Sequence, residues 1–260
     1  MNQNNVAAFR QLHYEPSALL LANVWDCASA ALVQRSGAKA IATSSASLAW
    51  ANGYADGGAL PVDVLLNSVE RITKLCQVPL SVDIEAGYCD KPEQVVELVI
   101  ELVGMGVVGI NIEDGQDSPD LLCAKLKAIR RVFGPDSLFI NARTDVYLQS
   151  LVATEQQRNE TQQRLARYAE YGADSVFVPG LLVLEDIRYL VTSNSVPLNI
   201  MLPSLETAVD EFIEAGVKRL SYGPGSFIAA YKPLSSFMGG ESEVAELNYE
   251  TLNELMLRPV

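Results

Sequence analysis

The sequence predicts a (β/α)₈ barrel, because eight short apolar runs alternate with stretches of helix length along its 260 residues. The runs are rich in β-branched residues and have the length of buried parallel strands. They cover residues 19–24, 38–43, 80–85, 107–113, 138–143, 175–179, 197–200 and 219–222. No Pro/Ser-rich linker interrupts this alternation, so the sequence predicts one domain over residues 1–260 rather than two.

The segments between these runs carry helical patterns. The clearest is a stripe of apolar residues spaced as one face of a helix, formed by Leu205, Ala208, Val209, Phe212 and Ile213. Several strands follow a glycine that we expect to end the preceding helix. These glycines are Gly37, Gly106, Gly172 and Gly216.

A further helical pattern follows the eighth strand, over residues 241–257. Its apolar positions Val244, Leu247, Leu252 and Leu255 need a surface to pack against. A neighbouring subunit is one such surface, so we expect a C-terminal helical extension that is a candidate for exchange between subunits.

The alternative architecture is a doubly wound sheet. That fold would place a glycine-rich phosphate-binding loop directly after the first strand. The corresponding segment, residues 23–30, contains no glycine. The barrel is therefore favoured.

The composition limits the classes of partner. Nineteen basic against 32 acidic residues give a net charge of −13, which argues against nucleic acid or an anionic membrane as partner. The four cysteines are scattered and form no C-x-x-C pair, as is typical of reduced thiols in a cytoplasmic protein. The polar N-terminus lacks the apolar core of a signal peptide, and the longest apolar stretch is interrupted by charges.

Acidic residues stand where two predicted strands end. Asp83 and Glu85 close one apolar run, and Glu113 closes the next. A carboxylate at such a position is costly unless a cation or hydrogen bonds compensate it. Because parallel strands of a barrel end at one face, three converging carboxylates predict a hard-cation site, with Mg²⁺ as the expected ion and Mn²⁺ as an alternative. The competing interpretation of each single acid is a solvated loop residue or a helix cap.

Other strand ends supply candidate substrate ligands. Arg143 offers a planar fork suited to a carboxylate or phosphate, although an internal salt bridge to Glu113 or Asp145 is equally consistent with its position. The turn 44–46 presents small residues and backbone N–H groups that could hold an oxyanion. Asn199, on the seventh strand, is a further candidate for lining the pocket. The only histidine, His13, is expected at the surface before the first strand.

Six motifs occur in an order and spacing that resemble the isocitrate lyase/phosphoenolpyruvate mutase superfamily, from about residue 9 to residue 235. They are Asn23-Val24-Trp25-Asp26 with Ser29-Ala30, Thr43-Ser44-Ser45-Ala46-Ser47-Leu48, Gly53-Tyr54-Ala55-Asp56, Asp83-Ile84-Glu85-Ala86-Gly87-Tyr88, Gly109-Ile110-Asn111-Ile112-Glu113-Asp114 and Asn141-Ala142-Arg143-Thr144-Asp145. The resemblance implies a barrel whose last helix is exchanged within a homodimer or homotetramer.

The resemblance also implies roles for individual residues. Asp83, Glu85 and Glu113 would hold Mg²⁺, partly through water, and Asp56 would be an essential carboxylate near the substrate. Ser44, with the backbone of Ser45 and Ala46, would bind the substrate carboxylate, and Arg143 its other anionic end. The chemistry shared by the family passes through an enolate of a 2-oxo acid that the metal stabilises.

Two departures from the family pattern narrow the expected activity. Lyases of the family carry a Lys-Lys/Arg-Cys-Gly-His loop after the Glu-Asp pair, whereas Cys123 here has neither the basic pair nor the Gly-His and is expected to begin a helix. Phosphonomutases of the family carry a longer gating loop than the short acidic segment at residues 115–123 of this chain. Glu85 also stands where the family commonly has aspartate.

We therefore expect a Mg²⁺-dependent lyase, decarboxylase or C–C hydrolase acting on a small 2-oxo or 2-hydroxy acid such as oxaloacetate. The alternatives are a phosphonomutase-type enzyme of C–P bonds and a non-catalytic protein that binds a 2-oxo acid.

Overall fold

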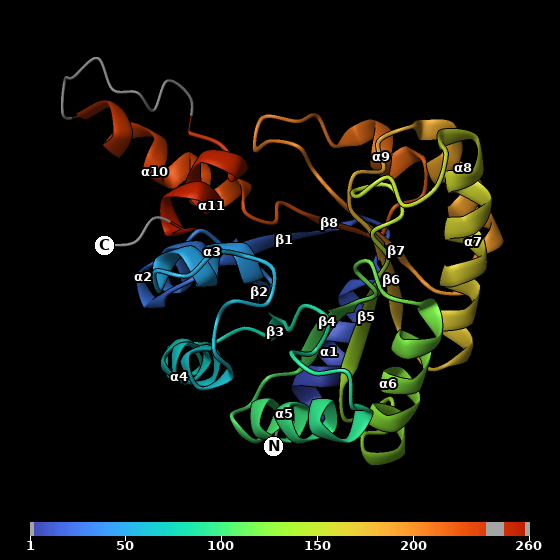
Figure 1. Cartoon of the computed structure of the whole chain (residues 1–260), viewed down its shortest axis with the longest axis horizontal. Coiled ribbons are helices and arrows are strands. Elements are labelled where there is room, and N and C mark those ends of the chain that lie inside the picture. The colour runs from blue at the N-terminus through green and yellow to red at the C-terminus, as the bar shows by residue number, and fades with distance from the viewer. Residues whose placement is uncertain (1–2, 238–246, 258–260) are drawn as a thin grey trace.

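The computed structural model describes residues 3–237 and 247–257, and its centre is a closed barrel of eight parallel strands (Figure 1). The strands are β1 (Leu19–Val24), β2 (Ile41–Thr43), β3 (Leu80–Asp83), β4 (Gly109–Glu113), β5 (Phe139–Arg143), β6 (Ser175–Val178), β7 (Leu198–Met201) and β8 (Arg219–Ser221). They pair in chain order, and β1 closes the barrel on β8, with Leu20 opposite Leu220. The predicted (β/α)₈ fold is confirmed.

Helices surround the barrel and extend beyond it. They are α1 (Gln3–Leu12), α2 (Cys27–Arg35), α3 (Ser45–Ala51), α4 (Val62–Thr73), α5 (Pro92–Gly104), α6 (Pro119–Val132), α7 (Thr154–Glu170), α8 (Leu184–Ser193), α9 (Asp210–Glu214), α10 (Gly225–Phe237) and α11 (Tyr249–Leu257). Gly37, Gly106, Gly172 and Gly216 have φ between 92° and 105°, the left-handed conformation expected after a helix end. Within the described part of the chain, no helix is both long and apolar enough to cross a membrane.

Three expectations about local structure need correction. The stripe beginning at Leu205 forms a helix only over Asp210–Glu214, because Ser204 and Thr207 bond to each other and to backbone in a turn, which leaves Leu205 46% exposed. The third strand ends at Asp83, not at residue 85, because the Gly87 N–H donates to the Ile84 carbonyl and turns the chain. Of the predicted C-terminal helix, Tyr249–Leu257 is observed, and residues 241–246, including Val244, lie outside the described residues.

His13 is buried at the closed end of the barrel and is not a surface residue. Its ring stacks on Phe139 at 4.3 Å between centroids and meets the edge of Phe9. Its Nδ1–H donates to the Phe9 carbonyl at 2.9 Å. Burial, helped by the charge of Arg219, lowers the pKa of His13 to about 3, so the ring is neutral. No sequence pattern predicts this burial, because His13 lies just after α1, before the first strand of the repeating strand–helix units.

The middle of the barrel is unusually polar. Barrel interiors are commonly filled by Val, Ile and Leu, but here the inward side chains include three asparagines, two serines and an arginine, all buried: Asn111, Asn141, Ser175, Asn199, Arg219 and Ser221. Hydrogen bonds among them join β4 to β8 across the interior. This layer forms a rigid floor for the open end of the barrel.

Candidate active site

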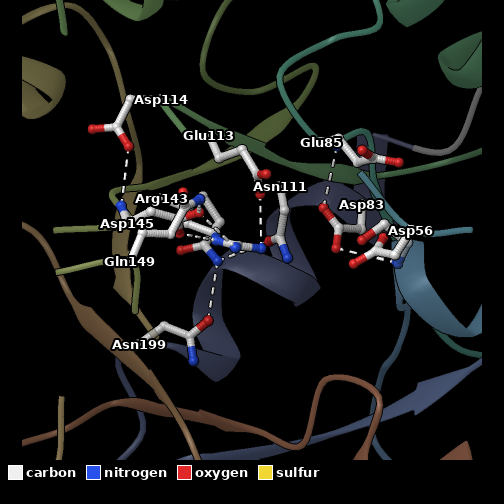
Figure 2. Close-up of polar contacts among 12 residues, drawn as sticks. Asp56, Asp83, Glu85, Asn111, Glu113, Asp114, Arg143, Asp145, Gln149 and Asn199 are labelled. Atoms are coloured by element: carbon white, nitrogen blue, oxygen red, sulfur yellow. Dashed lines mark hydrogen bonds and ion pairs between the residues drawn. The ribbon is translucent and has the colours of Figure 1, made fainter. Parts of the chain in front are cut away.

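A cavity of about 620 Å³ opens where the strands end. It is lined by eight of the nine residues predicted for the site: Ser44, Ser45, Ala46, Asp56, Asp83, Glu85, Glu113 and Arg143. In Figure 2, Asp56, Asp83 and Glu85 gather on one side and Glu113, Arg143 and Asp145 on the other, with Asn111 between them. Among the described residues that line the cavity, Arg143 is the one lysine or arginine.

Asp83 ends β3 and is 8% exposed. Two backbone N–H groups point at its carboxylate, that of Ser45 at 3.3 Å and that of Glu85 at 3.4 Å. Burial nevertheless raises the pKa of Asp83, and the nearby Arg143 only partly opposes that rise. The carboxylate therefore lacks sufficient positive charge around it.

Glu85 lies in the turn after β3, in a strained conformation with φ of 49°. The Tyr88 hydroxyl donates to its Oε1 at 3.0 Å. Burial, followed by the charges of Asp56 and Asp83, raises the pKa of Glu85 to about 7. Like charges held this closely indicate a site that a cation would stabilise.

Glu113 and Arg143 face each other across neighbouring strands, in direct register between β4 and β5. Arg143 Nη1 lies 2.7 Å from Glu113 Oε2, and its Nε and Nη2 donate to the two oxygens of Asp145 at 2.6 and 2.9 Å. Burial raises the pKa of Glu113, against the effect of Arg143. Burial also opposes the charge on Arg143, but Glu113 and Asp145 outweigh it and raise the pKa of the guanidinium. Both salt bridges considered from the sequence are present.

The described residues contain no group of three His, Cys, Asp or Glu arranged to hold a metal as they stand. The contacts explain why, since Arg143 lies against Glu113 and Tyr88 binds Glu85. The donors are nonetheless the hard carboxylate oxygens that Mg²⁺ prefers, and Mg²⁺ needs only one or two of them when water completes its coordination. Asp83, Glu85 and Glu113 thus fit the chemistry of the ion, and their role as its ligands stays a prediction.

The C-terminal helix α11 contacts the loop that carries Asp56. The Tyr249 hydroxyl donates to Asp56 Oδ2 at 2.8 Å, and the Asp56 N–H donates to Asn253 Oδ1 at 2.7 Å. The other carboxylate oxygen, Oδ1, is buried without a hydrogen-bond partner among the described residues. Asp56 is therefore oriented at the cavity wall with one oxygen unused.

The turn 44–46 leads from β2 into α3. The Ser44 hydroxyl caps α3 by accepting from the Ser47 N–H at 3.4 Å, and the Ser45 N–H is directed at Asp83. Ala46 packs in an apolar cluster with Trp50 and Leu252, so α11 also supports this turn. The turn thus lines the cavity and holds Asp83 in place.

Asn199 is not brought to the cavity, which corrects its expected role as a substrate ligand. It is fully buried, accepts from Asn141 Nδ2 at 3.1 Å and donates to the Arg219 carbonyl at 3.1 Å. Its position on β7 lies one layer below the strand ends. The residue of β7 that lines the cavity is Met201, two positions further along the strand.

Asp114 also serves the structure rather than the cavity. This buried carboxylate accepts from Thr144 Oγ1, the Asp145 N–H, Arg164 Nη1 and Tyr168 OH, at 2.6 to 3.0 Å. It fastens α7 to the loop after β5 and so fixes Asp145, the partner of Arg143.

The cavity lining also includes residues that sequence reasoning did not assign to the site, among them Asn111, Tyr249 and Glu250. Asn111 lies two positions before Glu113, and the alternation of a strand could have placed it on the same inner face. Tyr249 and Glu250 come from α11, far away in sequence. Only the fold brings them to the cavity, so no local pattern could have revealed them. Cys123 lies in a helix as expected, but α6 begins four residues earlier, at Pro119, and Cys123 packs in the core.

Comparison with known proteins agrees with this architecture. A family model described as phosphoenolpyruvate phosphomutase matches residues 9–239. The crystal structure of a putative phosphonomutase from Burkholderia cenocepacia is 36% identical, with a TM-score of 0.85, covering 91% of this chain and 100% of that one.

Two curated relatives show similar coverage. An uncharacterized protein from Mycobacterium tuberculosis is 32% identical over 233 residues, 86% of each chain. Oxaloacetate decarboxylase 1 from Pseudomonas putida is 27% identical over 240 residues, 86% of this chain and 80% of that protein. The family match spans most of the chain and coincides with the barrel, so this protein belongs to the phosphoenolpyruvate phosphomutase family of the isocitrate lyase/phosphoenolpyruvate mutase superfamily.

Proposed function

We propose that this protein is a Mg²⁺-dependent enzyme that breaks a carbon–carbon bond in a small 2-oxo or 2-hydroxy acid such as oxaloacetate, by decarboxylation or hydrolysis. The observation that carries the proposal is the charge pattern of the cavity. Three crowded carboxylates with raised pKa values, Asp83, Glu85 and Glu113, face one arginine among the described residues that line the cavity. This arrangement suits a divalent cation together with a small anionic substrate.

The proposed ligands of the ion are Asp83, Glu85 and Glu113, directly or through water. When bound, the ion supplies Lewis-acid stabilisation of negative charge that develops on the substrate. Mn²⁺ offers the same type of chemistry. A bound cation would balance the negative charge of these carboxylates. Arg143 would then be needed less as their counter-charge and could bind the substrate.

The chain's own residues would bind and orient the substrate. Two N–H groups of Arg143 donate to Asp145, and its Nη1 forms an ion pair with Glu113. We assign the remaining N–H groups to the substrate's far carboxylate. The turn 44–46 would bind the carboxylate next to the 2-oxo group. We assign the acceptance and return of a proton to Asp56, which Tyr249 holds and whose Oδ1 has no hydrogen-bond partner among the described residues.

The family match and the putative phosphonomutase from B. cenocepacia favour a second candidate, an enzyme of C–P bonds. A phosphonate substrate would bring more negative charge, which the described cavity lining meets with one arginine. A 2-oxo dicarboxylic acid therefore fits the cavity better. A protein that binds such an acid without turnover is the third candidate, and only product formation separates it from the enzymes.

We also propose a homo-oligomer in which α10 is exchanged between subunits, in place of the extension 241–257 expected from the sequence. The described part of that extension, α11, packs on α3 of its own chain, where Asn253 accepts from Trp50. The outer face of β1 beside α2 bears a groove of about 520 Å³, with Leu20 47% and Leu32 68% exposed. In Figure 1, α10 extends away from the barrel, and its Leu234 is 59% exposed. A groove and a helix that each expose apolar surface support the exchange. The mass in solution, by light scattering, tests it, and a monomer would contradict it.

The four cysteines form no disulfide in the described structure, which supports our proposal of a cytoplasmic location. Fractionation of cells that express the protein would test that assignment.

The activity is tested by ¹³C NMR of labelled oxaloacetate with protein and Mg²⁺. Pyruvate as product would indicate decarboxylation, and oxalate with acetate would indicate hydrolysis. Phosphonopyruvate in a parallel sample tests the second candidate. Oxaloacetate loss no faster than with Mg²⁺ alone would contradict the proposed substrate.

A further inference from the structure

Arg219 is an unusual residue of the barrel interior. It is 1% exposed, and no carboxylate of a described residue lies within ion-pair distance of it. Burial lowers its pKa to about 9, against the effect of Asp83, so the guanidinium is still charged at neutral pH. Among the described residues its side chain makes one hydrogen bond, from Nη2 to Asn111 Oδ1 at 3.1 Å. A buried charge with so few partners is costly and is seldom kept without a use.

The contact with Arg219 fixes the orientation of the Asn111 amide. A guanidinium can only donate, so the Asn111 atom that faces it must be the oxygen. A second chain of bonds leads to the same assignment. Asn199 donates to a backbone carbonyl and so presents its oxygen to Asn141, whose nitrogen then donates to Asn199 and, at 2.8 Å, to Asn111 Oδ1.

The nitrogen of the same amide is left for the cavity. Asn111 Oδ1 accepts two hydrogen bonds, while Asn111 Nδ2 donates to no described residue. Asn111 lines the cavity and pairs in register with Asp83 on the neighbouring strand. Figure 2 shows Asn111 between the two groups of acids. The floor of a strongly acidic cavity thus presents a hydrogen-bond donor.

We propose that Asn111 Nδ2 donates to a substrate oxygen that carries or gains negative charge, and that Arg219 and Asn141 are positioning residues that aim this amide. The inference rests on the proposed function and adds a specificity-determining contact to the same site. The charge of Arg219 behind the amide oxygen polarises the N–H groups and strengthens their bond to an anion. An acidic cavity needs such a donor, because a bare carboxylate in that place would repel the substrate.

Binding of oxalate, measured by calorimetry at saturating Mg²⁺, tests the contact without depending on turnover. Oxalate is a planar dianion that resembles the enolate of a 2-oxo acid. Asn111→Asp replaces the donor with an acceptor and gives Arg219 a counter-charge. The midpoint of thermal unfolding of this variant should therefore equal or exceed that of wild type. Asn111→Leu removes the donor without adding charge. If the leucine variant does not fold, Asn111→Ala is used in its place. Asn67→Asp, on the exposed face of α4, is the matched control.

We expect each Asn111 variant to bind oxalate about 10- to 100-fold more weakly, the range for a lost hydrogen bond to a charged group. The control should stay within about twofold of wild type. Folded Asn111 variants that bind as tightly as wild type would overturn the inference and leave the proposed function intact. If wild type itself neither binds oxalate nor consumes oxaloacetate, the proposed function fails and the inference falls with it.

Discussion

Replacing Glu85 with glutamine should stabilise the metal-free protein at alkaline pH. The Glu85 carboxylate is 7% exposed and lies near Asp56 and Asp83, which, after burial, raise its pKa from 4.5 to about 7. A carboxyl group whose pKa is higher in the folded than in the unfolded state contributes its full stability at pH values below the unfolded-state pKa. That contribution is lost as the pH rises through the folded-state pKa. The loss for Glu85 therefore falls between pH 4.5 and about 7.

The size of this effect follows from the two pKa values. A rise from 4.5 to about 7 corresponds to about 3 kcal/mol of unfolding free energy once Glu85 is fully ionised. Glutamine does not titrate and its oxygen can still accept from Tyr88. Without metal, Glu85→Gln should thus exceed wild type by up to about 3 kcal/mol at pH 8 and by less than about 1 kcal/mol at pH 5.

Urea unfolding with EDTA at the two pH values measures this difference. Glu101→Gln, on the exposed side of α5, is the matched control and should show no such pH dependence. Added Mg²⁺ should stabilise wild type more at pH 8 than at pH 5, and should stabilise Glu85→Gln less than wild type. If Glu85→Gln is no more stable than wild type at pH 8, the crowding of charge inferred for this cavity is refuted.

Three further substitutions address other parts of the site. Arg143→Lys should lower turnover at least about 100-fold, because an ammonium group cannot replace the planar guanidinium fork. Circular dichroism should show that the variant keeps the fold. Near-normal turnover would contradict this role of Arg143. Tyr249→Phe should lower kcat about 10-fold with little change in thermal midpoint, because it removes the hydrogen bond that orients Asp56, whereas the exposed Tyr14→Phe should have no effect on kcat. Asp114→Asn should cost about 3 kcal/mol in urea unfolding, since four donors meet one buried carboxylate, and a loss below about 1 kcal/mol would argue against that role.

The barrel could be predicted because its signal is local and repeated. Each strand is a short apolar run, and each of the four predicted helix ends carries a glycine with positive φ. The strand-end acids could be predicted for the same reason, since one rule of parallel barrels gathers all of them at one face. Asp83 and Glu113 line one cavity although about thirty residues separate them in the chain.

The remaining features depend on long-range packing. The burial of His13 depends on the stacking of Phe139 from a distant strand, and the inward layer that holds Asn199 below the cavity depends on the register of β7 against β6 and β8. Tyr249 reaches Asp56 only because α11 packs on α3. Sequence periodicity assigns a face to a residue but not its depth along the barrel axis, and this is why Asn199 was placed one layer too high.

The most direct test of the account is the initial rate of oxaloacetate consumption with Mg²⁺, compared among wild type, Glu113→Gln and the control Glu101→Gln. The account predicts a protein-dependent rate in wild type and the control that EDTA abolishes, and a loss of at least about 100-fold in Glu113→Gln. Equal rates in Glu113→Gln and wild type, or a wild-type rate that survives EDTA, would contradict it.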